Sequence, residues 1–371
     1  MVQPRPAEPG ITLDAVETPA LLVDLDAYER NLDRMATLLK GRTARLRPHA
    51  KTHKSPLIAA EQIARGAVGP CCQKVSEAEI LVEGGVADVL ISNEVVGASK
   101  IARVAALAKR ARIGICVDDA SNAHALGAAA VAAGSIVDVL VEIEVGGRRC
   151  GVEPGGPAIA LAKWVASTPG LRFRGLQAYH GSAQHVRDHA NRRRAIERAA
   201  QLTSLTVAAL AGAGLDCETI AGGGTGSLMI DLELGVLNEL QAGSYIFMDA
   251  DYGAAGTTGL DRGFENSLAV LSTVMSVPRA GVAICDAGLK AMTFESGPPR
   301  IDAPKGVRYA GPSDEHGNLE LAPGTTLPLG EKLRLVPGHC DPAVNLYDWY
   351  VGHRGQRVER VWPIAARGAS A

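Results

Sequence analysis

The chain has 371 residues, enough for one large domain and a smaller one, and its 47% apolar and 21% charged residues are ordinary for a soluble globular protein. Because the formal net charge is only -2, no overall electric field favours nucleic acid or an anionic membrane as a partner. No stretch approaches the roughly 20 apolar residues of a membrane-spanning helix.

The first elements in chain order are a polar arm and a short strand. Residues 1–10 are Pro-rich and lack the apolar core of a secretion signal, so we expect a frayed arm. Residues 18–24 predict a strand that could belong to either of two domains. The seven cysteines along the chain are odd in number and have no disulfide-framework spacing, which indicates reduced thiols and a cytoplasmic location.

From about residue 44 to about residue 244, short apolar runs alternate with amphipathic stretches rich in alanine and leucine. The predicted strands are 44–51, 69–75, 89–92, 112–117, 139–145, 173–178, 218–221 and 239–242. Helices are predicted over 29–39, 76–83 and 192–211, the second from the capping-box spacing of Ser76 and Glu79. Eight strand–helix units favour a closed (β/α)8 barrel, with an open doubly wound sheet as the alternative.

After about residue 264 the pattern changes to short β-rich runs separated by glycine and proline turns. The predicted strands there are 268–277, 283–286, 333–336 and 358–361. We therefore expect a barrel over residues 21–260 and an antiparallel β-domain made of residues 1–20 and 261–371.

Lys51 ends the first predicted barrel strand, and the carboxyl ends of barrel strands form the active-site rim. A lysine shielded there would have a lowered pKa and could form an imine with an aldehyde. The alternative is that Lys51 and Lys54 are solvated loop cations. His49 and His53 make a plain loop less favoured, although their role could be only to orient the backbone.

Two small-residue turns follow the last two predicted barrel strands, Gly222-Gly223-Gly224-Thr225 and Gly243-Ser244. Glycine lets backbone N–H groups approach a phosphate closely, and barrels often bind phosphate after their last two strands. No lysine of a nucleotide-binding P-loop is present in the first turn, so nucleotide hydrolysis is not expected. The alternative is a pair of ordinary tight turns.

His339 and Asp341 are two residues apart in a segment that reads as extended. On a strand both side chains point to one face and can bind one ion, while Cys340 points away. One nitrogen and one oxygen ligand completed by water favour Mn2+ or Mg2+, with Zn2+ or Co2+ also suited. The alternative is a structural His–Asp hydrogen bond.

Further polar residues follow two other predicted strands. Tyr179, His180 and His185 follow one of them, and histidine is the residue best able to move protons near neutral pH. Arg149 follows another and could place a cation near a bound cofactor. The alternatives are a packed tyrosine, surface histidines and a salt-bridging arginine.

Several long segments together resemble the bacterial D-threonine aldolases. They are residues 48–51, 71–78, 91–97, 176–185, 222–227, 241–253, 286–290, 314–317 and 339–341. The resemblance covers almost the whole chain. The broader group includes D-serine dehydratases and D-3-hydroxyaspartate dehydratases, and its pyridoxal-phosphate enzymes have the alanine-racemase-type fold, a barrel with a C-terminal β-domain, usually as a dimer.

The resemblance implies that Lys51 binds pyridoxal 5'-phosphate covalently and that His339 and Asp341 bind a divalent metal, with Mn2+ expected first. The aldolases carry His-x-Asp at the metal, whereas eukaryotic-type D-serine dehydratases tend to carry His-x-Cys with zinc. Asp341 therefore favours an aldolase, and Cys340 keeps the dehydratase open. His185 matches a family histidine near the metal, a candidate proton carrier.

The resemblance also implies the remaining cofactor contacts. Arg149 sits where related enzymes place an arginine on the phenolic oxygen of the cofactor. The turns at Gly224–Thr225 and Gly243–Ser244 would hold its phosphate. Gln241 stands where alanine racemases have an arginine facing the pyridine nitrogen, and either Gln241 or Tyr179 could meet that nitrogen here.

The implied reaction is retro-aldol cleavage of D-threonine, D-allothreonine or another β-hydroxy-D-amino acid to glycine and an aldehyde. One alternative is a dehydratase acting on D-serine or D-3-hydroxyaspartate. The other is a non-catalytic pyridoxal-phosphate carrier, a class that lacks the β-domain and the metal motif. We expect a homodimer with a small-molecule substrate and no nucleic-acid or membrane partner.

Overall fold

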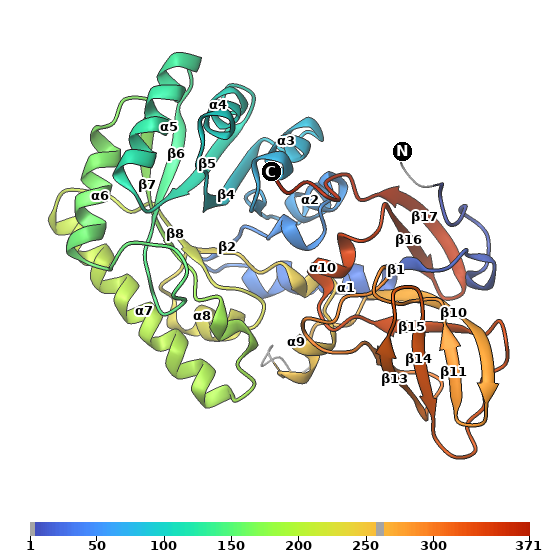
Figure 1. Ribbon diagram of the computed structural model, residues 1–371. Helices are drawn as coiled ribbons and strands as arrows, with labels where there is room; N and C mark the ends of the chain where they lie inside the picture. The colour runs from blue at the N-terminus through green and yellow to red at the C-terminus, as the bar shows by residue number, and fades with distance from the viewer. Residues whose placement is uncertain (1–3, 257–262) are drawn as a thin grey trace.

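The computed structural model describes residues 4–256 and 263–371, which form two parts, one built on a parallel sheet and one on a mostly antiparallel sheet (Figure 1). The strands of the parallel sheet are β2 (Arg45–Leu46), β3 (Cys71–Cys72), β4 (Asp88–Glu94), β5 (Arg112–Val117), β6 (Val137–Glu142), β7 (Leu171–Ala178), β8 (Thr219–Gly222) and β9 (Glu239–Leu240). They lie in the order β2-β9-β8-β7-β6-β5-β4-β3, and their pairings are parallel. All eight predicted barrel strands are confirmed.

The parallel sheet closes into a barrel between β2 and β3. His49, just after β2, forms a parallel bridge with Cys71 of β3, and the Cys71 backbone N–H donates to the Pro48 carbonyl at 2.9 Å. An open sheet would leave both strands as free edges. The closed (β/α)8 barrel is therefore confirmed, and the open doubly wound alternative is excluded.

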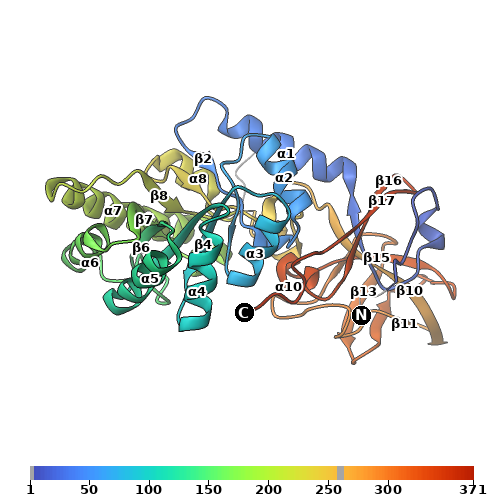
Figure 2. The same cartoon turned by 90° about the horizontal axis from the view of Figure 1, so that it is seen from above.

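Helices surround the barrel and extend to its junction with the second part (Figures 1 and 2). Their bounds are α1 (Leu25–Leu39), α2 (Pro56–Ala64), α3 (Val75–Glu83), α4 (Ala98–Leu107), α5 (Ala120–Ala133), α6 (Gly156–Ser167), α7 (His189–Gly212), α8 (Leu228–Leu234), α9 (Ala250–Ala254) and α10 (Cys340–Val344). Among these described helices, none has the length and apolarity that crossing a membrane would require.

The predicted cap of α3 is wrong. The helix begins at Val75, and the Glu77 carboxylate accepts the backbone N–H groups of Gln73 and Lys74 at 2.9 and 3.1 Å. Glu79 instead pairs with Arg103 on α4, at 2.7 Å between Oε1 and Nε. A carboxylate one turn inside a helix can satisfy the free N–H groups at its start, so the glutamate at 77 displaces the one at 79 from that role.

The second part is a nine-stranded sheet that takes strands from both ends of the chain. They are β1 (Ala20–Asp24), β10 (Leu268–Arg279), β11 (Val282–Cys285), β12 (Arg300–Ile301), β13 (Val307–Pro312), β14 (Gly317–Leu321), β15 (Lys332–Val336), β16 (Trp349–Arg354) and β17 (Arg357–Pro363). All its described pairings are antiparallel except that of β1 with β16.

Strand β1 settles the open assignment of residues 18–24, because it lies between β10 and β16 in the second sheet. The expected domain boundary at residue 21 therefore cuts through β1. The expected boundary at 260–261 lies outside the described residues. The frayed arm is also corrected for residues 4–10: Ala7 is buried, and the Gly10 N–H donates to the Val358 carbonyl at 2.8 Å.

Apolar side chains fill both faces of the barrel strands. One buried cluster takes a single residue from each of five strands, namely Cys71, Leu90, Cys116, Leu140 and Ala221. A larger cluster contains the neighbouring residues Cys72 and Ile91, which face the other way along the same strands. The Cys71-Cys72 pair is therefore part of a buried strand, and all seven cysteines are free thiols.

A buried ion pair joins Arg47, the residue after β2, to Glu239 of β9. Arg47 donates from Nε to Glu239 Oε2 at 2.5 Å and from Nη1 to Asp88 Oδ1 at 2.8 Å, and both Arg47 and Glu239 are buried. We expect Arg47→Met to lower the free energy of unfolding by about 3 kcal/mol, because it leaves Glu239 buried without its cation. Urea denaturation followed by circular dichroism measures this loss.

A matched control for Arg47 is available next to it. Arg45 contacts the same Glu239 carboxylate at 3.0 Å, but its side chain is 55% exposed. We expect Arg45→Met to cost at most about 1 kcal/mol. Equal losses in the two variants would contradict the assignment of the stability to the buried pair.

Candidate functional site

Lys51 and Asp341, 290 residues apart in sequence, meet at the junction of the two parts. Lys51 lies in a 3-10 helix (Ala50–Thr52) that follows β2, and its Nζ donates to Asp341 Oδ2 at 2.7 Å. The Asp341 charge raises the pKa of Lys51 above its ordinary value against the effect of burial. The predicted lowering of that pKa is therefore wrong, because a carboxylate at contact distance outweighs desolvation.

The two histidines beside Lys51 orient the backbone. His49 Nδ1 accepts the Lys51 backbone N–H at 3.4 Å, and His53 Nδ1 accepts the Ser55 backbone N–H at 3.1 Å. Burial lowers the pKa of His53 to about 3 and that of His49 well below its usual value. Lys54 is not a solvated cation, because its Nζ donates to the buried Glu77 carboxylate at 2.5 Å.

His339 and Asp341 converge as predicted, but not on a strand. Strand β15 ends at Val336, and α10 begins at Cys340, immediately after the extended residue His339. The distance from His339 Nε2 to Asp341 Oδ2 is 3.8 Å. Pro342 was the signal for a helix start, since proline fits the first turn of a helix.

Cys340 does not point away from the pair. Its Sγ lies 3.4 Å from Asp341 Oδ1, and its side chain is fully buried. Burial raises the pKa of the Cys340 thiol well above its usual value, and the nearby Asp249 and Asp341 carboxylates add to the effect. Without a bound metal, the thiol is therefore protonated near neutral pH.

Sequence reasoning missed Asp249, a fully buried residue that contacts this segment. Its Oδ2 bonds to His339 Nδ1 at 2.7 Å and accepts the Cys340 backbone N–H at 3.0 Å, and its Oδ1 accepts the Tyr252 backbone N–H at 2.9 Å. Asp249, His339 and Cys340 can bring one potential ligand atom each to within 4.8 Å of one another. Burial alone would lower the pKa of His339, but Asp249 and Asp341 raise it.

His185 lies beside the His339–Asp341 pair. It ends a 3-10 helix (Ser182–His185), and its ring centroid is 5.9 Å from that of His339 and 5.2 Å from that of Tyr252. Its Nδ1 bonds to Asp251 Oδ2 at 2.6 Å, a second carboxylate that the sequence did not indicate. The structure thus brings the predicted proton carrier to the predicted metal ligands.

Arg149 and Tyr179 contact each other through the face of the aromatic ring. The guanidinium carbon of Arg149 lies 5.5 Å from the ring centroid of Tyr179, and its Nη2 is 3.7 Å from Glu142 Oε1 at the end of β6. Burial raises the pKa of Tyr179, and the charges of Lys51 and Arg149 partly offset it. Burial and the neighbouring Glu94 raise the pKa of Glu142 to about 8.

Gln241 is held by a second glutamine. Its Nε2 donates to Gln177 Oε1 at 2.9 Å, and Gln177 Nε2 donates back to Gln241 Oε1 at 2.8 Å. Both residues are buried. This reciprocal pair holds the Gln241 amide in place and engages both its oxygen and its nitrogen.

The two small-residue turns both require glycine for close packing. A Cβ at Gly224 would lie 2.5 Å from Gln184 Oε1, and one at Gly243 would lie 2.5 Å from Thr52 Oγ1. Next to Gly224, the Thr225 Oγ1 is buried and has no hydrogen-bond partner among the described residues. Next to Gly243, the Ser244 Oγ donates to Asp341 Oδ1 at 3.5 Å, which joins this turn to the Lys51 contact.

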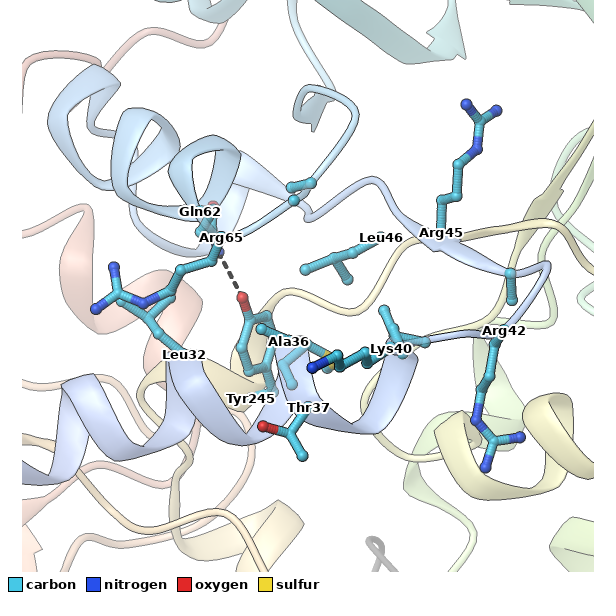
Figure 3. Close-up of a pocket in the computed structure, with 15 residues that line it drawn as sticks. Leu32, Ala36, Thr37, Lys40, Arg42, Arg45, Leu46, Gln62, Arg65 and Tyr245 are labelled. Carbon is cyan, nitrogen blue, oxygen red and sulfur yellow. Dashed lines mark hydrogen bonds between the residues drawn. The ribbon is translucent and has the colours of Figure 1, made fainter.

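A separate pocket lies at the other end of β2 (Figure 3). Its lining includes Lys40 and Arg45, and Tyr245, whose hydroxyl accepts a hydrogen bond from Gln62 Nε2 at 3.1 Å. Arg45 begins β2, whereas Lys51 follows the carboxyl end of the strand. None of the predicted site residues lines this pocket, although Tyr245 directly follows Ser244 in the chain.

Two family models match the two parts of the chain. The alanine racemase N-terminal domain matches residues 23–251, and a putative serine dehydratase domain matches residues 267–353. The first covers the barrel, and the second covers most of the second sheet together with the segment from His339 to Asp341.

Individual relatives match over nearly the full length. A D-threonine aldolase of Arthrobacter sp. is 49% identical over 99% of this chain and 97% of its own. A 3-hydroxy-D-aspartate aldolase of Paracoccus denitrificans (strain Pd 1222) is 45% identical over 98% and 95%. The crystal structure of D-threonine aldolase from Filomicrobium marinum has a TM-score of 0.96 at 52% identity, with each chain wholly covered. The chain therefore belongs to the D-threonine aldolase family, and in it an alanine-racemase-type barrel is joined to a serine-dehydratase-type domain.

Proposed function

We propose that the protein is an aldehyde-lyase that cleaves β-hydroxy-D-amino acids, D-threonine and D-allothreonine among them, to glycine and an aldehyde. The observation that carries the proposal is the meeting of Lys51, His339 and Asp341 in one place. A lysine able to bind an aldehyde cofactor there lies next to a histidine–carboxylate pair able to bind a metal. Relatives 45% and 49% identical to the chain, both named as aldolases, support it.

The residues present fit pyridoxal 5'-phosphate. Lys51 Nζ would bind its aldehyde carbon, and Arg149 its phenolic oxygen. The unpartnered Thr225 Oγ1, with the Gly224 and Gly243–Ser244 turns, would meet the phosphate. When bound, the pyridoxal ring withdraws electrons from the bonds at the substrate Cα. Tyr179 or Gln241 would lie at the pyridine nitrogen.

The donor set also fits a divalent metal. His339 Nε2 and Asp341 Oδ2 offer one nitrogen and one oxygen 3.8 Å apart, a spacing that two ligands of one ion can adopt. We expect the bound ion to be Mn2+, with Mg2+, Co2+ or Zn2+ as alternatives. Such an ion supplies Lewis-acid activation of the β-hydroxyl.

Proton transfer and positioning of the substrate are the roles of side chains of this chain. Because His185 Nδ1 is bonded to Asp251, its Nε2 is the atom that accepts the β-hydroxyl proton. With the cofactor held at Lys51, the Cα of a bound substrate would lie beside the Lys51 amine. The Asp341 carboxylate lies 2.7 Å from Lys51 Nζ, so the proposed metal ligand and the proposed cofactor lysine are close enough to act on one small substrate.

A product assay tests the proposal against dehydration. The holoenzyme with D-threonine is expected to release glycine and acetaldehyde, and with D-serine it is expected to release little pyruvate. Formation of 2-oxobutanoate or pyruvate with ammonia as the main product would contradict the aldolase and favour the dehydratase. Binding of pyridoxal phosphate without turnover of either amino acid would favour the non-catalytic carrier, which the His339–Asp341 pair and the second sheet disfavour.

Thr225 gives a test of the cofactor site that needs no substrate. We expect Thr225→Val to weaken pyridoxal-phosphate binding about tenfold or more, because a hydrogen bond to a charged oxygen contributes roughly 1.5–3 kcal/mol. Absorbance titration of the cofactor-free protein measures the dissociation constant. Thr225→Ser keeps the hydroxyl and should bind nearly as the parent does, and parent-like binding by the valine variant would remove Thr225 from the phosphate site.

We also propose a cytoplasmic homodimer whose partners are small β-hydroxy-D-amino acids, without nucleic acid or membrane. The free state of all seven cysteines supports a reducing compartment. Light scattering coupled to size-exclusion chromatography is expected to give about twice the 38.6 kDa chain mass. A monomeric mass would contradict the dimer.

A further inference from the structure

A single turn, residues 249–252 at the start of α9, carries two carboxylates that each bond to a different histidine of the candidate site. Asp249 Oδ2 bonds to His339 Nδ1 at 2.7 Å. Asp251 Oδ2 bonds to His185 Nδ1 at 2.6 Å. The two histidines come from the second part and from the barrel, so this turn is where both are set relative to each other.

The turn is fixed to the segment that carries His339. The backbone N–H groups of Ala250 and Asp251 donate to the carbonyls of Pro337 and Gly338 at 3.0 and 3.1 Å. The Cys340 N–H donates in the opposite direction, to Asp249 Oδ2 at 3.0 Å. Three hydrogen bonds therefore make the turn and residues 337–340 one unit, and the turn cannot shift without moving His339.

Asp249 is better explained as a support than as a metal ligand. It is fully buried, and its two oxygens meet His339 Nδ1 and the backbone N–H groups of Cys340 and Tyr252. An ion bound through Asp249 would compete with these three hydrogen bonds of a fully buried carboxylate. Keeping them leaves His339 Nε2 directed toward Asp341 Oδ2, 3.8 Å away.

We propose that residues 249–252 form a positioning turn, in which Asp249 fixes His339 with Nε2 free for the metal and Asp251 fixes His185 with Nε2 free for the substrate proton. A carboxylate on one ring nitrogen places the hydrogen there and leaves the lone pair on the other. The roles of the two histidines rest on the proposed function, whereas the geometry does not.

The first experiment reads the ring nitrogens directly in the unaltered holoenzyme. Protein labelled with nitrogen-15 in histidine is studied by long-range proton–nitrogen NMR, at a pH above the range in which histidine titrates, with and without Zn2+ as a diamagnetic probe. We expect Nδ1–H in both His185 and His339 and a metal-induced shift at His339 Nε2. An Nε2–H form of either residue would overturn its half of the proposal, whatever reaction the enzyme performs.

The second experiment separates the two carboxylates. We expect Asp249→Asn to weaken Mn2+ binding about 10–100-fold, with kcat largely restored at saturating Mn2+. We expect Asp251→Asn to leave Mn2+ binding unchanged and to lower kcat about 100-fold at saturating metal, with KM little changed. Metal binding is measured by calorimetry without substrate, so it tests Asp249 even if aldol cleavage is absent.

The matched control is Asp302→Asn, which removes an exposed carboxylate paired with Arg300 and should change neither quantity. Parent-like metal affinity and kcat in both site variants would overturn the proposal. If Asp249→Asn fails to fold, the NMR measurement on the unaltered protein still decides the question for His339.

Discussion

Replacing Lys51 with alanine is expected to lower kcat/KM for D-threonine by about 1,000-fold or more, since the covalent attachment of the cofactor and a charged group beside the substrate Cα are lost together. The visible absorbance of the bound cofactor imine should disappear from the purified protein. Steady-state assays and an absorbance spectrum of the same sample measure both effects.

The informative companion to that variant is Lys51→Arg. Arginine keeps the cation that contacts Asp341 Oδ2 at 2.7 Å, but it does not form a stable imine with the cofactor. We therefore expect the arginine variant to be as inactive as the alanine variant. Near-normal activity in the arginine variant would mean that Lys51 serves only as an ion-pair partner, and the proposed cofactor linkage would fall.

Replacing Asp341 with asparagine is expected to weaken Mn2+ binding about 100-fold or more, because the amide removes the charge of one of the two proposed ligands. Chelation of the parent protein should abolish activity, and added Mn2+ should restore it. Full activity in a sample whose metal content is verified to be negligible would contradict the proposed metal role.

Cys340 provides the control for the metal site. Its buried thiol adjoins Asp341 without a place in the proposed ligand pair, so Cys340→Ser should retain Mn2+ binding within a few-fold. A large loss of affinity in the serine variant would indicate that Cys340 is a ligand. The metal would then be bound through adjacent residues, His339 and Cys340, a spacing that differs from the His-x-Cys of the dehydratases.

The barrel could be predicted because its strands are buried on both faces and read as short apolar runs between turns. The run 112–117 matches β5 along its whole length, whereas the run 44–51 contains a strand of only two residues, Arg45–Leu46. At that point the barrel closes through backbone contacts of Pro48 and His49 rather than through a long ladder. The length of a strand at which a barrel closes depends on a partner strand far away in sequence. A local sequence pattern holds no information about that partner.

The chemical residues of the site were predictable from their types and spacing, but their supports were not. Asp249 bonds to a residue 90 positions away, and Asp251 to one 66 positions away, so neither carboxylate carries a local signal of its partner. The wrong pKa direction for Lys51 has the same origin, because Asp341 is brought to it only by folding. The helix at Cys340 is different: Pro342 marked its first turn, and a local pattern could have found it.

Strand β1 has a consequence for biosynthesis. Its apolar residues Ala20–Val23 leave the ribosome early, but the partner strand β16 emerges about 330 residues later, tens of seconds at ordinary translation rates. Its other partner strand, β10, emerges about 250 residues after β1, so until then this segment has no strand to pair with, and Asp341 joins Lys51 later still. The nascent chain therefore exposes an apolar segment for most of its synthesis, and its candidate site is completed only near the end. We expect chaperones that bind nascent chains to bind this segment.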